Sequence, residues 1–207
     1  MVPELGLRER KKQRTRQALI DAAVRLFEHN GYDNTTVADI AAEAEVSTRT
    51  FFLHFPTKEA VVFANSRRRV ELGLEVISSP RPGETLRQLV GRAMREMIDD
   101  TTATDLESGL GALRVRMLVS TPTLREALFR GLFAAQAEFA TALQEAYRGQ
   151  LDATEAAALI GAVLGAVECA ALQSVQQGES ASQLREAMLK ANEIGCRCLP
   201  ALRTANK

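Results

Sequence analysis

The chain has 207 residues, a formal net charge of zero and 46% apolar residues, with no Trp and two Tyr. Balanced charge excludes a surface that is basic throughout, and the apolar share is sufficient for a hydrophobic core. Ala, Leu, Glu, Arg and Gln are abundant, and no segment alternates apolar and polar residues long enough for a strand, so we expect an all-α fold of about nine helices.

The N-terminal region combines a basic run with an amphipathic helix. Between Arg8 and Arg16 six cationic residues stand against one acid, Glu9. We expect a helix from about Lys11 to His29, which the Asn30-Gly31 pair ends. The basic run, placed just before this helix, indicates a polyanionic partner at one end of the chain, although a solvated terminus has the same composition.

Two short helices follow almost without a connection. Thr36 and Asp39 have the spacing of a capping box, which predicts a helix to about Glu43. Ser47 is a good N-cap for a second helix that ends at about His54, before Pro56. Helix, turn of about three residues and helix are the dimensions of a helix-turn-helix unit, which we place at 36–55.

The second short helix has small and polar residues at its tip. In a helix-turn-helix unit the N-terminal residues of this helix enter the major groove of DNA, where Arg can bind guanine and Thr methyls can contact thymine. Phe51 and Phe55 lie four residues apart and would anchor the helix to the first one. A helical hairpin with a solvated surface is the alternative interpretation. The expected tip is Ser47, Thr48, Arg49 and Thr50.

The rest of the chain reads as longer helices. Thr57 is expected to cap a fourth helix that runs to about Ile77, and Ser79–Gly83 is the clearest break. Further helices are expected at about 86–97, 106–117, 123–142, 152–177 and 182–199. We expect Pro122 to stop one of them and the 123–126 capping box to start the next. The predicted domains are a DNA-binding domain at 8–58, a connecting helix at 59–78 and a helical domain at 79–207.

The segment Arg14–Ala64 resembles the N-terminal domain of the TetR family of transcriptional regulators. The shared features are LF followed by a G-Y turn, T-V-x-x-I-A, the V-S that starts the recognition helix, an aromatic pair before F, and T-K-E. The resemblance implies a homodimer that binds a palindromic operator in double-stranded DNA, most often a repressor released by a small molecule. It implies no cofactor and no enzymatic activity.

The resemblance also assigns residues to the DNA surface. Phe52 stands where the family often has a Tyr whose hydroxyl reaches phosphate, and Glu45 stands where the turn often has Gly. Phe52 cannot make that hydrogen bond, and a left-handed Glu45 would cost on the order of 1 kcal/mol. The implied DNA-contacting residues are Thr36, Ser47, Thr48, Arg49, Thr50, Phe52, His54 and Lys58, joined by Lys11, Lys12 and Arg14 of the basic run.

The larger domain is expected to hold an effector pocket and a dimer interface. An unknown hydrophobic or amphipathic effector could contact Met94, Met97, Leu113, Met117, Phe129, Phe133 and Phe139, although ordinary core packing explains each residue equally. The 152–177 helix is apolar on nearly every side, so a partner's helix would cover it. The expected interface residues are Leu159, Gly161, Val163, Gly165, Met188 and Gly195.

Other chemistries find little support in the sequence. Cys169, Cys196 and Cys198 lack a metal-ligand spacing, and without a visible export signal or membrane span we expect them reduced in the cytoplasm. The carboxylates of Asp99, Asp100, Asp105 and Glu107 have no accompanying nucleophile or base. The alternatives are a helical carrier or interaction protein that does not bind DNA, and a DNA-binding activator or cysteine-based sensor.

Overall fold

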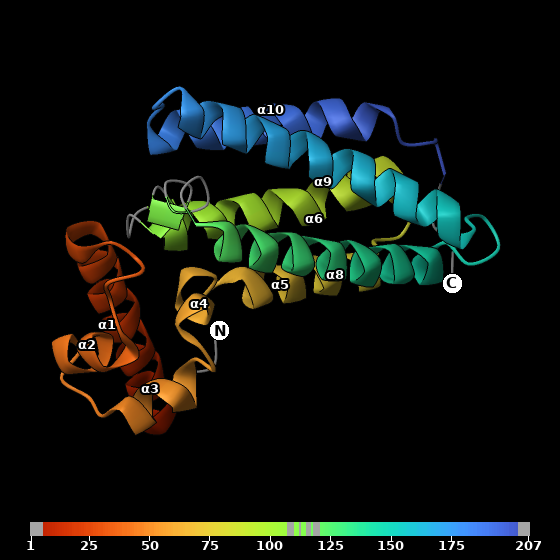
Figure 1. Cartoon of the computed structure of the whole chain (residues 1–207). Coiled ribbons are helices and arrows are strands. Elements are labelled where there is room, and N and C mark those ends of the chain that lie inside the picture. The colour runs from red at the N-terminus through yellow and green to blue at the C-terminus, as the bar shows by residue number, and fades with distance from the viewer. Residues whose placement is uncertain (1–5, 107–109, 112, 115–116, 118–120, 203–207) are drawn as a thin grey trace. The chain divides into compact units, whose positions relative to one another are not determined.

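The computed structural model describes residues 6–106, 110–111, 113–114, 117 and 121–202. Within these ranges the regular secondary structure is helical, which confirms the all-α prediction (Figure 1). The chain divides into two compact units. Unit 1 comprises Met1–Ala64 and Ser108–Leu124, and unit 2 comprises Asn65–Glu107 and Arg125–Lys207.

Unit 1 contains α1 (Leu7–Asn30), α2 (Val37–Glu43), α3 (Thr48–His54) and α4 (Lys58–Val62). The predicted caps are present, since Thr36 and Asp39 form a reciprocal capping box and the hydroxyls of Ser47 and Thr57 accept from backbone amides. The start of α1 was wrong in the prediction, because the helix begins at Leu7 rather than Lys11. The basic run is therefore the first part of α1 and not an arm before it.

The predicted fourth helix is two helices, α4 and α5 (Ser66–Ser78). The break at 63–65 contains no Gly or Pro, and side chains from elsewhere in unit 1 explain it. Arg114 Nε donates to the Val62 carbonyl at 2.8 Å, and Arg16 donates to the Ala64 carbonyl. A continuous helix would use both carbonyls as acceptors for amides four residues later.

A separate hydrophobic core holds unit 1 together. Ile20, Ile40, Phe51 and Phe55 are buried in it, each at most 2% exposed, so α1, α2 and α3 share one interior. Residues from the second segment of the unit complete this core. They are Leu110, Leu113, Met117 and Leu124.

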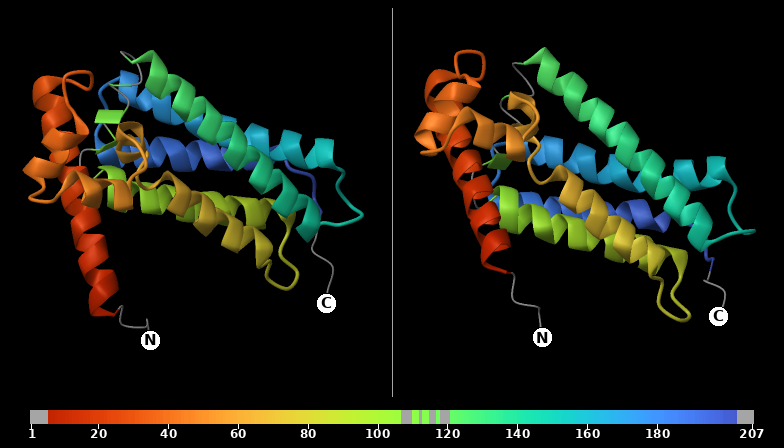
Figure 2. Two further views of the ribbon diagram at one scale, coloured as in Figure 1. Left: turned by 60° about the horizontal axis from the view of Figure 1, so that its bottom comes forward. Right: turned by 90° about the horizontal axis from the view of Figure 1, so that it is seen from below.

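Unit 2 contains α5, α6 (Leu86–Thr101), the π-helix η1 (Thr102–Leu106), α9 (Ala153–Gln176), α10 (Ala181–Arg197) and most of α8 (Pro122–Ala146). Two views show α9 and α10 side by side, as one layer over α5, α6 and α8 (Figures 1 and 2). The helix pairs α9–α10, α5–α6 and α6–α10 pack together, and their buried apolar side chains form the second core.

Helix starts in unit 2 follow local capping chemistry with two corrections. The predicted Asp152–Glu155 capping box is present. The last helix is capped by Ser180 rather than by Ser182. Ser180 is followed three residues later by Gln183, and the two residues form a capping box. Pro122 begins α8 instead of stopping a helix. Pro has no backbone N–H, and the first turn of a helix has no intrahelical acceptor for that group.

A buried ion pair joins α5 to η1 inside unit 2. Arg69 Nη1 lies 2.5 Å from Asp105 Oδ2, with the two side chains 10% and 0% exposed. Asn65 Nδ2 donates to the other carboxylate oxygen of Asp105 at 2.8 Å. The π-helix places Asp105 within the core of the unit, where only a fully bonded carboxylate is tolerated.

Candidate nucleic-acid interface

The turn between α2 and α3 sets the angle at which α3 leaves α2. Glu45 is left-handed, with φ of 54°, in the position where the sequence lacks a Gly. The Glu45 amide donates to Ala42 O at 3.0 Å and the Val46 amide to Ala41 O at 2.9 Å, so the turn satisfies the end of α2. These bonds offset the steric cost of a left-handed Glu, which is on the order of 1 kcal/mol.

Helix α3 has one buried aromatic face and one polar end. Phe51 and Phe55 are 0% and 2% exposed, with ring centroids 5.8 Å apart, and they fix α3 to the rest of unit 1. Ser47, Thr48 and Arg49 at its start are exposed. Among the described residues of unit 1 nothing covers this tip, so three adjacent polar side chains are accessible to an external partner.

The remaining residues of α3 have distinct roles. Ser47 Oγ accepts from the Thr50 amide at 3.1 Å and lies 2.8 Å from Thr50 Oγ1, so both hydroxyls are engaged in the cap. Phe52 is 55% exposed and Leu53 is 75% exposed. An apolar exposed face therefore follows the polar tip, in keeping with a Phe that cannot donate a hydrogen bond to phosphate.

Arg16 has a structural role that was not predicted from its place in the basic run. Its Nη1 donates to the His54 carbonyl at 3.1 Å, its other terminal nitrogen to the Ala64 carbonyl, and its guanidinium lies 4.2 Å from the centre of the Phe55 ring. Burial lowers the pKa of Arg16 from its usual value. One side chain of α1 thus fixes the end of α3 and the break after α4.

The position of Lys58 differs from that of a free phosphate contact. Its ammonium donates to the carbonyls of Tyr32 at 2.8 Å and Thr35 at 3.0 Å, and it lies 4.0 Å from the centre of the Tyr32 ring. The Tyr32 hydroxyl donates to Glu59 Oε1 at 2.6 Å. Lys58 therefore ties the α1–α2 loop to the start of α4.

The cationic part of α1 lies near the C-terminal end of α3. The pKa of His54 is lowered first by burial and then by the charges of Arg16 and Lys12, which places both cations close to the imidazole. The other candidates of the basic run, Lys11 and Arg14, are exposed as well. Exposed cations near the C-terminal end of α3 give this part of unit 1 the chemistry of a phosphate-binding surface.

The structure separates the candidate effector contacts. Met94, Met97 and Phe139 line a small apolar void of about 10 Å³ in unit 2. Phe129 and Phe133 are 57% and 69% exposed on α8. The other two candidates, Leu113 and Met117, lie in the core of unit 1.

The apolar void borders a tightly packed glycine. A Cβ at Gly73 of α5 would lie 2.6 Å from Met97 Sδ and 2.8 Å from the Phe139 ring. The glycine thus lets these two side chains reach the backbone of α5. In this arrangement the void has room for about one water-sized sphere, and a larger molecule would have to displace Met97 or Phe139.

The candidate dimer residues also divide into two groups. Val163 and Gly195 are buried between α9 and α10 of the same chain, where a Cβ on Gly195 would come within 3.1 Å of Val163 Cα. Leu159 and Met188 pack partly against the core of unit 2. Gly161 and Gly165, in contrast, face open space.

A further set of apolar residues, not selected from the sequence, accompanies the two open glycines. Together they form what we call the α9 stripe, at helical spacings of three and four residues. The α9 stripe consists of Ala158, Gly161, Ala162, Gly165, Cys169 and Leu172, and Ile194 of α10 is exposed too.

Helix α9 is unusually apolar for a helix with so much exposed surface. It is the one described helix whose length and composition would allow it to cross a membrane, a test that core helices also pass. Only 28% of its most apolar 18-residue window is buried in the structure. Because apolar surface of this extent is costly in water, the α9 stripe indicates an interface.

The described residues offer no support for a metal centre or a carboxylate active site. No cluster of three or more His, Cys, Asp or Glu side chains that could hold a metal occurs among them. Asp99, Asp100 and Asp105 pair with Arg185, Arg68 and Arg69. Glu107 lies outside the described residues. Cys196 is buried, whereas Cys169 and Cys198 are exposed.

Known proteins resemble the chain in both sequence and fold. Residues 19–64 match the model of the tetR family of bacterial regulatory proteins. The HTH-type transcriptional regulator TcmR of Streptomyces glaucescens is 39% identical over 113 residues, which cover 55% of this chain and 50% of TcmR. The chain spans half or less of the length of the first curated relatives that it matches.

Solved structures extend the likeness of fold over nearly the whole chain. The fatty acid degradation regulator FadR of Bacillus halodurans is 17% identical with a TM-score of 0.61, covering 96% of this chain and 100% of that one. Thermus thermophilus FadR, a TetR-family repressor in complex with lauroyl-CoA, is 21% identical with a TM-score of 0.53, covering 90% and 96%. Residues 19–64 are therefore a helix-turn-helix domain of the tetR type, and the fold of the chain as a whole is similar to that of solved TetR-family regulators.

Proposed function

We propose that the chain is a DNA-binding transcriptional regulator, acting in the cytoplasm as a homodimeric repressor that a small molecule releases from a palindromic operator. The observation that carries the proposal is the exposed polar tip of α3, held in place by the buried Phe51 and Phe55. Unit 1 would bind DNA, and unit 2 would dimerise and bind the effector.

The recognition chemistry follows from the start of α3. Arg49 lies in the first turn of the helix, where it can reach the O6 and N7 of a guanine, and the Thr48 methyl can contact thymine. Thr50, whose hydroxyl is engaged in the cap, would contribute mainly its methyl. These side chains would read sequence in the major groove, whereas the neighbouring groups would bind the backbone.

Phosphate contacts would surround this tip. Thr36 is exposed at the start of α2, and Ser47 at the start of α3, where backbone amides favour anions. Lys12 and His54 lie near one another beside the end of α3. Lys11 and Arg14 would extend the cationic surface along α1, Phe52 would make apolar contact only, and Lys58 would act chiefly by holding the loop before α2.

Dimerisation through the α9 stripe would place two copies of α3 on one operator. Two recognition helices that read a palindrome must lie about 34–36 Å apart, one helical turn of DNA. The small side chains of Gly161 and Gly165 would allow α9 of a second copy to approach closely. Leu172 and Ile194, 47% and 49% exposed, would become buried at its edges.

The effector would be apolar or amphipathic and would enter between α5, α6, α8 and α9. Met94, Met97 and Phe139 line the void there, and the complex of Thermus thermophilus FadR with lauroyl-CoA supports an amphipathic ligand. Entry would displace Met97 or Phe139 from Gly73 and so shift α5. A full switch requires a preference of about 10⁴-fold, roughly 5.5 kcal/mol, for the released state.

Substitution of Arg49 tests the assignment most directly. Arg49→Ala should weaken binding to an operator in the DNA flanking the gene by about 1–3 kcal/mol and relax preference at one base pair. Fluorescence anisotropy at several salt concentrations measures both effects. Arg148→Ala, a change at an exposed arginine of unit 2, is the control. Equal binding by wild type and Arg49→Ala would remove Arg49 from the site, and binding that ignores salt would favour a carrier protein.

A further inference from the structure

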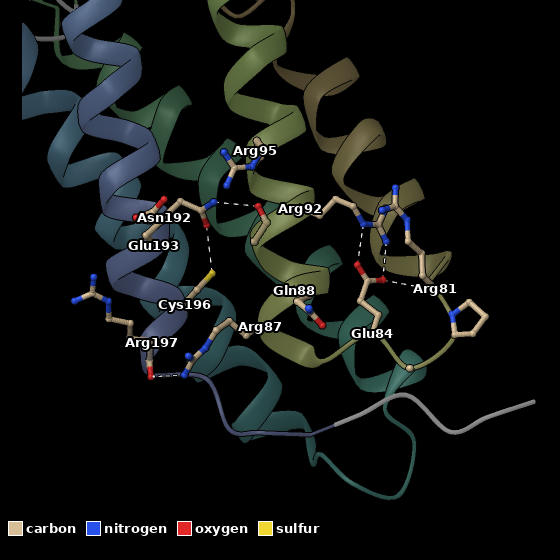
Figure 3. Close-up of a pocket in the computed structure, with 13 residues that line it drawn as sticks. Arg81, Glu84, Arg87, Gln88, Arg92, Arg95, Asn192, Glu193, Cys196 and Arg197 are labelled. Atoms are coloured by element: carbon tan, nitrogen blue, oxygen red, sulfur yellow. Dashed lines mark hydrogen bonds and ion pairs between the residues drawn. The ribbon is translucent and has the colours of Figure 1, made fainter.

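An open groove runs between α6 and α10 of unit 2, next to the turn that precedes α6 (Figure 3). It encloses about 840 Å³, within the range of small-molecule sites. Two carboxylates line it, those of Glu84 and Glu193. The cationic lining is larger and consists of Arg81, Arg87, Arg92, Arg95 and Arg197.

One of these arginines forms a bidentate ion pair within the groove. Arg92 donates from Nε and Nη2 to the two oxygens of Glu84, at 2.9 and 2.8 Å. The bonds from Arg92 hold the pKa of Glu84 below its usual value, so this carboxylate stays ionised and paired. The groove keeps an excess of positive charge that the pair does not cancel.

Arg87, Gly91 and Arg95 form a row along α6. Their spacing of four residues places them on one side of the helix, with about 12 Å between the outer two backbone positions. Gly91 leaves a gap between the two long side chains. In that gap Asn192 Nδ2 donates to the Gly91 carbonyl at 3.0 Å, and Cys196 Sγ donates to Asn192 Oδ1 at 3.3 Å (Figure 3).

Two observations show that both guanidinium groups belong to the groove. Arg87 Nη2 donates to the Arg197 carbonyl at 3.2 Å, which fixes the side chain across the groove end. Arg87 and Arg95 both act to lower the pKa of Cys196, although burial outweighs them and raises it to about 11. The two cations therefore lie on either side of one buried polar floor.

We propose that this groove binds a small molecule that carries a diphosphate or two neighbouring phosphate groups. Guanidinium groups bind phosphate oxygens in bidentate fashion. The backbone positions of Arg87 and Arg95 are farther apart than two linked phosphorus atoms, so both long side chains would turn toward the ligand over the gap at Gly91. The site lies on a different side of α6 from the apolar void and goes beyond the proposed effector site. The exposed Glu193 would oppose an anion, and the five arginines of the lining outnumber it.

Inorganic pyrophosphate is the probe for this site, with succinate as a dicarboxylate of comparable length. Isothermal titration of the full chain at fixed ionic strength should show binding of pyrophosphate and much weaker binding of succinate. The double variant Arg87→Gln/Arg95→Gln should lose about tenfold or more in affinity, because each replaced guanidinium removes charged hydrogen bonds. The control Arg130→Gln/Arg148→Gln removes two exposed arginines elsewhere in unit 2 and should leave affinity unchanged.

Gly91 gives a second test that does not depend on removing arginines. A Cβ there makes an ordinary contact of 3.5 Å with Cys196 Sγ, so Gly91→Ala should fold and bind, whereas Gly91→Glu places a carboxylate in the gap and should abolish binding. Each of three results would overturn the proposal. The wild type does not bind pyrophosphate, the groove and control double variants lose affinity equally, or a folded Gly91→Glu binds as the wild type does. Operator binding by these variants should stay at the wild-type level, which separates this site from the DNA surface.

Discussion

The two units are both helical, but they expose different kinds of surface. In unit 1, α3 is a helix of seven residues, and the buried Phe51 within it and Phe55 just after it leave its polar end exposed. In unit 2, α9 is a helix of 24 residues whose apolar stripe is left uncovered. Exposed polar groups suit a charged partner such as DNA, and exposed apolar groups suit a second copy of the chain. What each helix leaves exposed therefore indicates its partner better than what it buries.

The largest effect is expected from removing the anchor of α3. Phe51→Ala should destabilise unit 1 by about 3–5 kcal/mol, because a fully buried ring is replaced by a cavity. Phe52→Ala, at a side chain that is 55% exposed, should cost under about 1 kcal/mol. Hydrogen exchange followed peptide by peptide would locate the loss. A similar cost for both variants would contradict the assigned orientation of α3.

A charge introduced into the α9 stripe tests whether this apolar surface is a dimer interface. Ala162→Glu should weaken dimerisation about 100-fold, roughly 3 kcal/mol, because each copy would bury an unpaired carboxylate. Ala157→Glu adds the same charge at an exposed position beside the stripe and should have little effect. Analytical ultracentrifugation measures the dissociation constant. Were Ala162→Glu as dimeric as wild type, the stripe would not be the interface.

Substitutions of Lys58 and Lys12 distinguish a lysine that stabilises the fold from a lysine that contacts DNA. Lys58→Met should destabilise unit 1 by about 1–3 kcal/mol, because the carbonyls of Tyr32 and Thr35 lose a charged donor. Lys12→Met should leave thermal unfolding unchanged but lower the salt slope of DNA binding by about 0.9. Thermal melts and salt titrations of both variants provide the measurements. Wild-type stability in Lys58→Met would return this lysine to a purely phosphate-binding role.

The smallest expected effect is a pH dependence through His54. Burial, Arg16 and Lys12 lower its pKa in the free protein, so the unfolded chain takes up a proton first as pH falls below about 6.5. This histidine thus reduces the stability of unit 1 as the pH falls from about 6.5 to its lowered folded pKa. A nearby phosphate favours the protonated form, so DNA affinity should rise several-fold over the same fall in pH. Anisotropy titrations of wild type and His54→Gln test this, and the variant should show the flatter profile.

Local chemistry made much of unit 1 predictable from the sequence. The cap at Thr36, the cap at Ser47 and the pair Phe51 and Phe55 each depend on residues within four positions of one another, and all are present in the structure. The break after α4 was missed because its causes, Arg16 and Arg114, are distant in the sequence. For the same reason nothing in the sequence indicated that Lys58 would bind two carbonyls.

Apolar periodicity alone predicted less in unit 2. It identified α9 as unusually apolar but could not tell the side that packs on α10, with Val163, from the side with Gly161 and Gly165. Likewise, Leu113 fits a stripe that could line any interior, and the structure assigns it to the core of unit 1. Periodicity shows that a face is apolar, whereas the partner of that face depends on tertiary packing.

The buried pair of Arg69 and Asp105 has a consequence for how an effector could act. Asn65, bonded to Asp105, is the residue at which unit 2 begins, and Asp105 lies two residues before this first segment of the unit ends. Separating Arg69 from Asp105 would strand a charge in an apolar interior at a cost of about 3–5 kcal/mol. Intermediate positions of α5, in which the ion pair with η1 is broken, are therefore disfavoured. The response to an effector should then be all-or-none rather than graded.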